Sequence, residues 1–164
     1  MSPIIWNESY SVHNSAIDDQ HKTLFEIFRK LHVQCDNNDL ESLKEALLEL
    51  LRYTVYHFKA EEIYMVDLNY RGIIMHRIEH NYFIKRIQEV IDLQDNRSAH
   101  RLRILITFLS SWLVQHVMGE DKKIPVTATV GKRPGVTLKS CVAQELSPPA
   151  YPPSQPERIS HHAE

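Results

Sequence analysis

Proline is scarce in most of this 164-residue chain, since only Pro3 of its eight prolines precedes Pro125. A proline inside a helix removes a backbone hydrogen bond and clashes with the preceding turn, so long helices are possible before residue 125. The remaining segment is rich in proline, serine and threonine and has little periodic apolar sequence, which does not offset the entropy of ordering. We predict one folded domain over residues 1–124 and a disordered, proline-rich C-terminal tail over residues 125–164.

Cysteine is also scarce. The two cysteines, Cys35 and Cys141, lie far apart in the sequence. Such a pair forms neither a disulfide framework nor a thiolate metal site. Any metal bound by this chain is therefore expected to be held by nitrogen and oxygen ligands.

The chain has neither an excess of charge of one sign nor a long apolar run. Its formal net charge is −2, with both signs mixed along the sequence, so we expect no nucleic-acid partner. No stretch approaches the roughly 18 to 20 consecutive apolar residues that cross a bilayer. Residues 1–10 lack the basic and apolar regions of a signal peptide. We therefore expect no membrane association and a cytoplasmic location.

A helical pattern fills the region between residues 15 and 121, where apolar side chains recur at steps of three and four. Polar breaks at 36–39, 69–72 and 95–98 divide it into four helices, the first beginning with a capping box from Ser15 to Asp18. Short connections make neighbouring helices antiparallel, so the predicted fold is all-α, an up-down-up-down four-helix bundle. The predicted core stripes are Ile17, His21, Leu24, Phe28, Leu31 and Cys35; Leu40, Leu43, Leu47, Leu50, Thr54, His57 and Glu61; Ile73, His76, His80, Phe83, Ile87 and Val90; and Leu102, Leu105, Leu109, Trp112 and His116.

Six histidine and carboxylate residues fall on these stripes, and a seventh follows the last one. Burying an unpaired carboxylate or a group of imidazoles costs on the order of several kcal/mol unless a metal ion satisfies them. Because alternate helices run in opposite directions, all seven are expected at one end of the bundle. Their chemistry suits two iron ions that are bridged by carboxylates and keep one position open for a small ligand. The predicted metal ligands are His21, His57, Glu61, His76, His80, His116 and Asp121.

The spacing of these residues favours convergence. His57 and Glu61, like His76 and His80, are four residues apart and share a helix face. Asp121 follows His116 by five residues, a rotation of about 500°, so it is expected to reach the site from the last, fraying turn of its helix.

The remaining histidines are interpreted without a metal. We interpret His32 and His100 as histidines that hydrogen-bond the backbone and are exposed or semi-buried, and we expect His13, His161 and His162 to be solvated. Glu62 points roughly 100° away from Glu61 and is expected at the surface. Spacing alone does not distinguish a core role from a pocket-lining role for Leu24, Phe25, Phe58 and Trp112.

The sequence closely resembles the hemerythrin family in its bacterial single-domain form. The matching segments, in the family's order and spacing over residues 6–123, are Trp6 with IDDQH at 17–21, HFKAEE at 57–62, HRIEH at 76–80 and WLVQHVMGED at 112–121. The chain departs from the family at His13 and Asn14, where a small and an apolar residue are common, and in its longer tail.

The resemblance implies a di-iron centre. In that arrangement His76, His80 and His116 hold one iron and His21 and His57 hold the other. Glu61 and Asp121 bridge the two irons together with an oxo or hydroxo group. The family binds dioxygen reversibly at the iron that has only two histidines.

We therefore expect a non-haem di-iron protein that binds dioxygen for storage, delivery or sensing, rather than an enzyme. Two alternatives stay open: an enzyme that reduces peroxide or nitric oxide, and an oxygen-responsive module that acts on another protein. The tail holds a PPxY pattern at 148–151 for proline-recognising modules, which leaves a protein partner possible, although such a match arises easily by chance.

Overall fold

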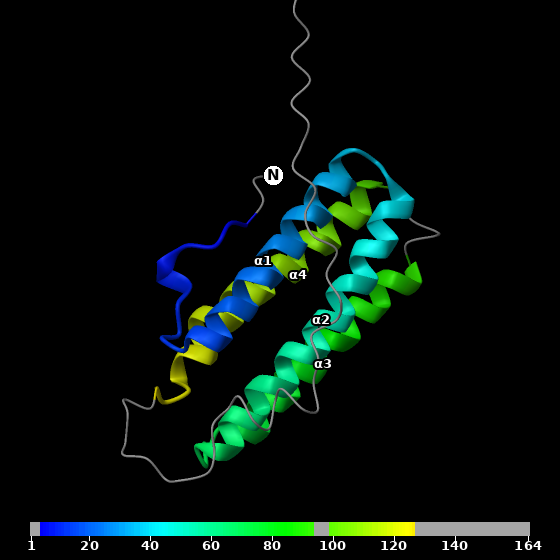
Figure 1. Ribbon diagram of the computed structural model, residues 1–164. Coiled ribbons are helices and arrows are strands. Elements are labelled where there is room, and N and C mark those ends of the chain that lie inside the picture. Colours follow the sequence, from blue (N-terminus) through cyan, green and yellow to red (C-terminus); the bar gives the residue numbers. More distant parts are fainter. Residues whose placement is uncertain (1–3, 94–98, 127–164) are drawn as a thin grey trace, which may run out of the picture.

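The computed structural model describes residues 4–93 and 99–126. Four long helices account for most of this part of the chain (Figure 1): α1 (Ser15–Asp36), α2 (Leu40–Asp67), α3 (Ile73–Leu93) and α4 (Ala99–Gly119). Two single-turn 3-10 helices accompany them, η1 (Glu8–Tyr10) before α1 and η3 (Asp121–Lys123) after α4. The predicted tail begins at residue 125, and its residues 127–164 lie outside the described residues, as does the polar break at 95–98.

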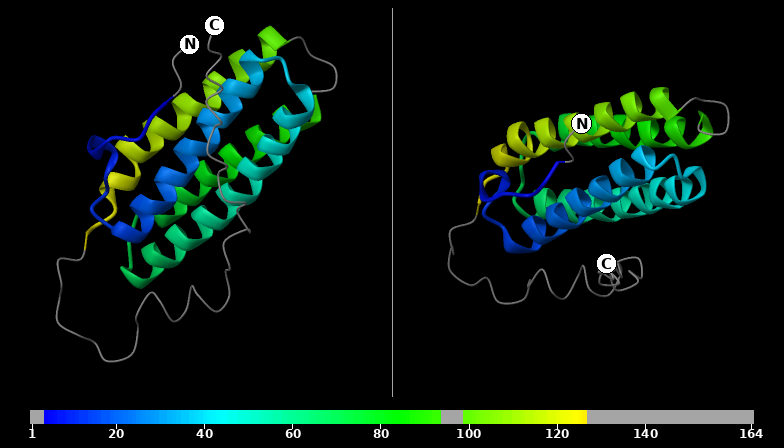
Figure 2. Two further views of the ribbon diagram at one scale, coloured as in Figure 1. Left: turned by 45° about the horizontal axis from the view of Figure 1, so that its top comes forward. Right: turned by 90° about the horizontal axis from the view of Figure 1, so that it is seen from above.

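The helices form the predicted up-down-up-down antiparallel bundle. Helix α1 packs against α2 and α4, and α3 packs against the same two helices. Both further views show the four axes running side by side, with successive connections at opposite ends (Figure 2). The prediction of an all-α four-helix bundle is confirmed.

The start of α1 differs from the predicted capping box. Asn14, not Ser15, is the N-cap, and its side chain accepts hydrogen bonds from the backbone N–H groups of Ala16 and Ile17. The carboxylate of Asp18 instead accepts from the Val12 N–H and the Ser11 hydroxyl, both at 2.8 Å. Asp18 thus fixes the segment that leads into α1.

Asparagines and an aspartate shape the connections between helices. Asp39 caps α2 by accepting from the Ser42 N–H. Asn38 and Asn69 follow the ends of α1 and α2 with φ values of 57° and 51°, a left-handed conformation that asparagine tolerates better than most residues. His13, with φ 60°, makes a similar bend before α1.

The predicted core stripes are largely buried, with corrections in α2 and α4. Leu40 is 47% exposed, because it is the first residue of α2 and lies beyond the packed part of the bundle. In α4 the fully buried stripe runs through Ile106, Leu113 and Val117 besides Leu102 and Leu109, which leaves Leu105 and Trp112 half-buried. The buried face of α4 is therefore rotated from the one that the spacing predicted.

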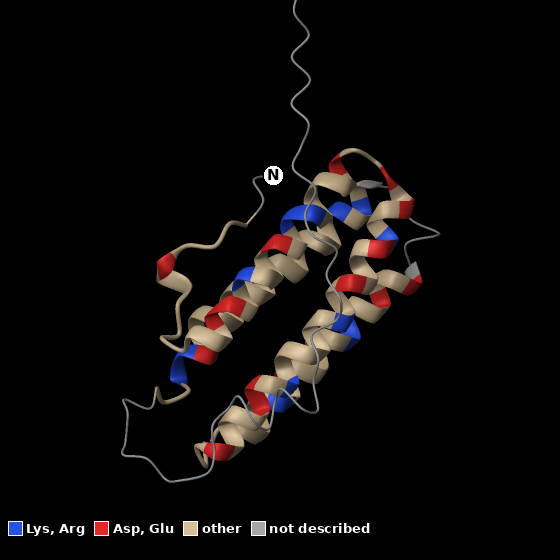
Figure 3. Cartoon of the chain, in the orientation of Figure 1, with Lys and Arg blue, Asp and Glu red and all other residues tan. Residues whose placement is uncertain are grey.

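Helix α4 is more apolar than the sequence analysis expected. The segment His100–Lys123 is long and apolar enough to cross a membrane by length and composition. In the bundle, however, its apolar stripe forms part of the core, and core helices of non-membrane proteins often have such a composition. Acidic and basic residues are intermixed along the helices (Figure 3).

Candidate metal centre

All seven predicted ligands meet at one end of the bundle. His21 lies in the second turn of α1, His57 and Glu61 near the end of α2, His76 and His80 near the start of α3, and His116 near the end of α4. Asp121 begins η3. None of the seven is more than 4% exposed. The structure thus brings together every residue that the sequence selected, while their role as metal ligands stays a prediction.

The seven residues form two groups that share a carboxylate. One group contains Glu61, His76, His80, His116 and Asp121, and the other contains His21, His57 and Glu61. Within each group the potential ligand atoms lie within 4.8 Å of one another. Asp121 also reaches the second group, because its Oδ2 lies 3.2 Å from Nε2 of His21 while its Oδ1 lies 3.2 Å from Nε2 of His76. Both carboxylates therefore lie between a three-histidine and a two-histidine side.

The potential ligand atoms are arranged to bind a pair of cations rather than to hydrogen-bond one another. Among the described residues, buried polar atoms without a hydrogen-bond partner are concentrated here: both ring nitrogens of His21, Nε2 of His57 and His80, Oε1 of Glu61 and both carboxylate oxygens of Asp121. Nε2 of His21 and Nε2 of His80 each lie 3.2 Å from a carboxylate oxygen, of Asp121 and Glu61 respectively, but without hydrogen-bond geometry. Nε2 of His76 and Nε2 of His116 face each other at 3.1 Å. Such orphaned atoms are costly in a core unless a cation satisfies them.

The protein holds both carboxylates in the ionised form that a metal requires. Burial and the neighbouring Asp121 would raise the pKa of Glu61, but the close contacts of His76 and His80 with its carboxylate prevail and lower the pKa to about 2. Burial would also raise the pKa of Asp121, but the charge of His116 and the close contacts of His116, His21 and His76 with the carboxylate hold it well below its usual range.

The histidines respond unequally to this environment. Burial lowers the pKa of His57 to about 3, so its ring is neutral and able to coordinate. Burial would also lower the pKa of His76, but the close contacts of its ring with the carboxylates of Asp121 and Glu61 overcome this effect and raise the pKa to about 10. In the absence of a metal, a proton on His76 supplies positive charge that the carboxylates attract. A bound cation would take over that role and leave the ring neutral.

Three polar residues contact the Nδ1 atoms of predicted histidine ligands. Gln20 of α1 contacts Nδ1 of His57 at 3.0 Å through its Oε1, and Glu62 of α2 contacts Nδ1 of His80 at 3.0 Å. Glu79 of α3 contacts Nδ1 of His116 at 2.9 Å. Each supporting residue is adjacent in sequence to one predicted ligand and bonds a ligand on the next helix. These contacts turn the rings so that Nε2 faces the centre.

The sequence analysis missed these supporting roles. Glu62 was expected at the surface, but its carboxylate binds His80 and Arg77, and its side chain is only 24% exposed. The rotation of about 100° from Glu61 is correct, but it directs Glu62 toward α3 rather than solvent. The immediate proximity of Gln20, Glu62 and Glu79 to predicted ligands was the available signal.

Aromatic rings fix two of the imidazoles. Phe58 stacks on His80 with ring centroids 3.6 Å apart, and Trp112 stacks on His116 at 4.6 Å. Trp6, from the segment before α1, lies beside His21 with ring centroids 6.3 Å apart. Phe58 and Trp112 therefore contact the candidate centre, which answers the question that spacing left open for these two residues.

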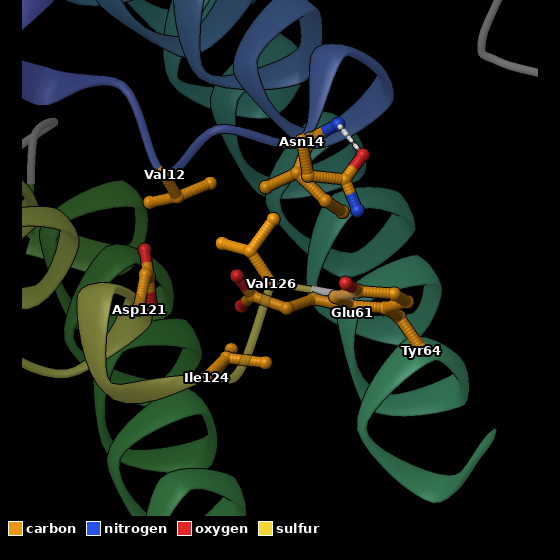
Figure 4. Close-up of a pocket in the computed structure, with 8 residues that line it drawn as sticks. Val12, Asn14, Glu61, Tyr64, Asp121, Ile124 and Val126 are labelled. Atoms are coloured by element: carbon orange, nitrogen blue, oxygen red, sulfur yellow. Dashed lines mark hydrogen bonds between the residues drawn. The ribbon is translucent and has the colours of Figure 1, made fainter. Parts of the chain in front are cut away.

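A small pocket leads to both carboxylates from the end of the bundle (Figure 4). The segment after α4 forms one side, where the Tyr64 hydroxyl donates a hydrogen bond to the carbonyl of Pro125 at 3.3 Å. Glu61 and Asp121 both line this pocket. Its lining residues are Val12, Asn14, Ile17, Glu61, Tyr64, Asp121, Ile124 and Val126.

The other histidines lie away from the centre or outside the described residues. His32 is buried and its Nε2 hydrogen-bonds the hydroxyl of Ser110 at 3.0 Å, which satisfies it without a metal. His13 and His100 are exposed. His161 and His162 fall in the part of the tail that the structure does not describe.

Comparisons with known proteins agree with this geometry. Residues 12–124 match the family model described as Hemerythrin HHE cation binding domain. A hemerythrin-like protein of Naegleria gruberi is 35% identical over 122 residues, covering 74% of this chain and 91% of that protein. A myohemerythrin of Riftia pachyptila is 30% identical over the same coverage of both chains.

A solved structure gives the same result for the fold. The crystal structure of wild-type hemerythrin superposes with a TM-score of 0.66 and 25% identity, covering 74% of this chain and 95% of that one. The sequence match extends over most of the described bundle and includes all seven clustered residues. The chain belongs to the hemerythrin family.

Proposed function

We propose that this protein holds two iron ions through the seven clustered residues and binds dioxygen reversibly. The observation that carries the proposal is the pair of buried groups of potential metal ligands that share Glu61. Several nitrogen and oxygen atoms in these groups have no hydrogen-bond partner. Its membership of the hemerythrin family supports iron as the metal. When bound, the two irons would supply the electrons that dioxygen takes up on binding and returns on release.

The chain's own residues fit this task. His21 and His57 provide one histidine fewer than the opposite group, so the two-histidine position has room for a small ligand. Leu24, Phe25 and Phe58 are almost fully buried around this end and limit water at the centre. A dry, apolar surrounding favours the return of an intact ligand over its loss by protonation. Storage, delivery and sensing all use this same property.

An anaerobic experiment tests the proposal. Metal-free protein is loaded with iron(II), and its absorption spectrum and iron content are measured before oxygen, after oxygen and after oxygen is removed again. We expect two irons per chain and a colour that appears and disappears with oxygen. Catalytic consumption of peroxide or a reductant, without release of intact dioxygen, would replace the carrier by the enzyme alternative. A single zinc per chain and no iron uptake would overturn the proposal.

A further inference from the structure

The residues that support the histidines carry different charges on the two sides of the centre. On the three-histidine side, the carboxylates of Glu62 and Glu79 contact Nδ1 of His80 at 3.0 Å and Nδ1 of His116 at 2.9 Å. On the two-histidine side, the neutral amide oxygen of Gln20 contacts Nδ1 of His57 at 3.0 Å. Nδ1 of His21 has no hydrogen-bond partner among the described residues.

This difference changes how strongly the rings donate to a cation. A carboxylate that accepts the Nδ1 proton pulls it away from the ring, so electron density at Nε2 increases. An amide oxygen accepts the same hydrogen bond but carries no net charge, so it orients the ring with a weaker effect on donation. Supporting residues of this kind typically alter metal affinity about 10- to 100-fold.

The arrangement around the bundle makes the difference specific to one side. Glu62 lies on α2 and Glu79 on α3, yet each contacts a histidine of the three-histidine group on the following helix. Arg77 also contacts Glu62 at 2.8 Å and holds its carboxylate in place. Gln20 makes the corresponding contact from α1 to His57. One type of contact therefore occurs three times, with a charged acceptor only on the three-histidine side.

We propose that the two metal positions are unequal and fill in order, with the His76, His80 and His116 position first and the His21 and His57 position second. Glu62, Glu79 and Gln20 are positioning residues that set part of this difference, in addition to the number of histidines. The inference rests on the proposed function, because it requires a centre for two metals. It adds the order of filling and the residues that control it.

Cobalt(II) is a suitable probe, because its visible absorption reports coordination without any oxygen chemistry. Metal-free protein is titrated with cobalt(II) under nitrogen and followed by calorimetry and absorption. We expect two binding steps per chain. His57→Ala should remove the weaker step and His80→Ala the tighter one, which assigns each step to its position.

The supporting residues are then changed without altering their shape. Glu62→Gln and Glu79→Gln should each weaken the tighter step about 10-fold or more and change the weaker step much less. Gln20→Glu should strengthen the weaker step. Glu89→Gln is the matched control, since Glu89 also lies on α3 but contacts Arg86 on the surface, and it should change neither step.

The outcomes separate this inference from the proposed function. Two cobalt steps that Glu79→Gln and Glu62→Gln leave unchanged would overturn the inference alone, as would an effect of equal size from Glu89→Gln. A stronger tight step in Gln20→Glu would also overturn it. Failure of the unmodified chain to bind two metals of any kind would overturn the proposed function itself.

Discussion

Oδ2 of Asp121 lies 3.2 Å from Nε2 of His21, so the last predicted ligand in the sequence touches the first. Asp121 reaches this position because α4 ends at Gly119 and the chain turns into η3. A regular helix would have carried residue 121 about 140° past His116. The break in the helix, rather than its periodicity, brings the seventh group into the centre.

Replacing Asp121 should weaken metal binding and leave the surface of the bundle unchanged. Asp121→Asn removes the charge that faces three histidines, so we expect fewer than two irons per chain and weaker binding of those that remain. Glu120→Gln is the control, because the neighbouring Glu120 contacts only Lys123 among the ion pairs of the described residues. Metal analysis after iron loading and gel filtration measures the difference. Two irons retained by Asp121→Asn would show that Asp121 is not a required ligand.

The metal-free protein should be most stable near pH 6.5. Below that pH the unfolded His57 binds a proton that the buried ring, with a pKa of about 3, does not, so stability falls as the pH drops. Glu61, with a folded pKa of about 2, adds to this loss below pH 4.5. Above pH 6.5 the folded His76, with a pKa of about 10, keeps a proton that the unfolded chain has lost, so stability falls as the pH rises toward 10.

Urea unfolding of chelator-treated protein between pH 3 and pH 10 measures this profile. The variant His57→Gln should flatten the profile between pH 6.5 and pH 4.5, keep the loss from Glu61 below pH 4.5, and leave the basic side unchanged. Iron-loaded protein should lose the decline between pH 6.5 and pH 10, because a bound cation replaces the proton on His76. A metal-free stability that keeps rising from pH 6.5 to pH 9 would contradict the assigned role of His76.

Ser110 should stabilise the bundle through His32. The Ser110 hydroxyl contacts Nε2 of His32 at 3.0 Å and donates to the carbonyl of Ile106 at 2.6 Å, and both side chains are buried. Ser110→Ala leaves a buried ring nitrogen without its partner, at a cost of about 1–3 kcal/mol in the free energy of unfolding. Ser111→Ala, on the exposed neighbour, should cost much less. Equal losses in the two variants would show that the buried hydrogen bond contributes nothing specific.

The end of the folded domain can be located by shortening the chain. The boundary proposed from the sequence is residue 124, yet Val126 lines the pocket and the carbonyl of Pro125 accepts from Tyr64. A chain ending at Val126 should keep the thermal midpoint and the metal content of the full protein. A chain ending at Lys123 also loses the buried Ile124, so we expect a midpoint several degrees lower. A large loss in the chain ending at Val126 would mean that residues 127–164 pack on the bundle.

The sequence predicted the four helices and the clustering of six of the seven residues because both depend on periodicity, whereas Asp121 joins them through the break after α4. Leucines and histidines on one helix face share a buried side, whatever the details of packing, and antiparallel order then places the polar members at one end. Whether Phe58 and Trp112 serve only the core or also contact the centre was left open for the same reason. Spacing identifies a face, but it does not say which side chain on that face touches which.

The features that the sequence did not predict depend on contacts between elements. Asn14 rather than Ser15 is the N-cap because the backbone bends at His13. Hydrophobic periodicity does not predict such a bend. The contacts of Gln20, Glu62 and Glu79 follow from the angle at which neighbouring helices meet. The rotated face of α4 follows from its packing against both α1 and α3, which buries Ile106 and Leu113. Each requires the assembled bundle.

The contact between Asp121 and His21 also affects local unfolding of the protein. Chain ends normally open first, since their residues have the fewest buried contacts. Here a cation shared by Asp121 and His21 would fasten the turn after α4 to the second turn of α1, so fraying at either terminus of the domain would require release of the metal. Local opening at the C-terminal end and loss of iron should therefore be one event, visible as amide hydrogens of η3 that exchange only as fast as the metal leaves.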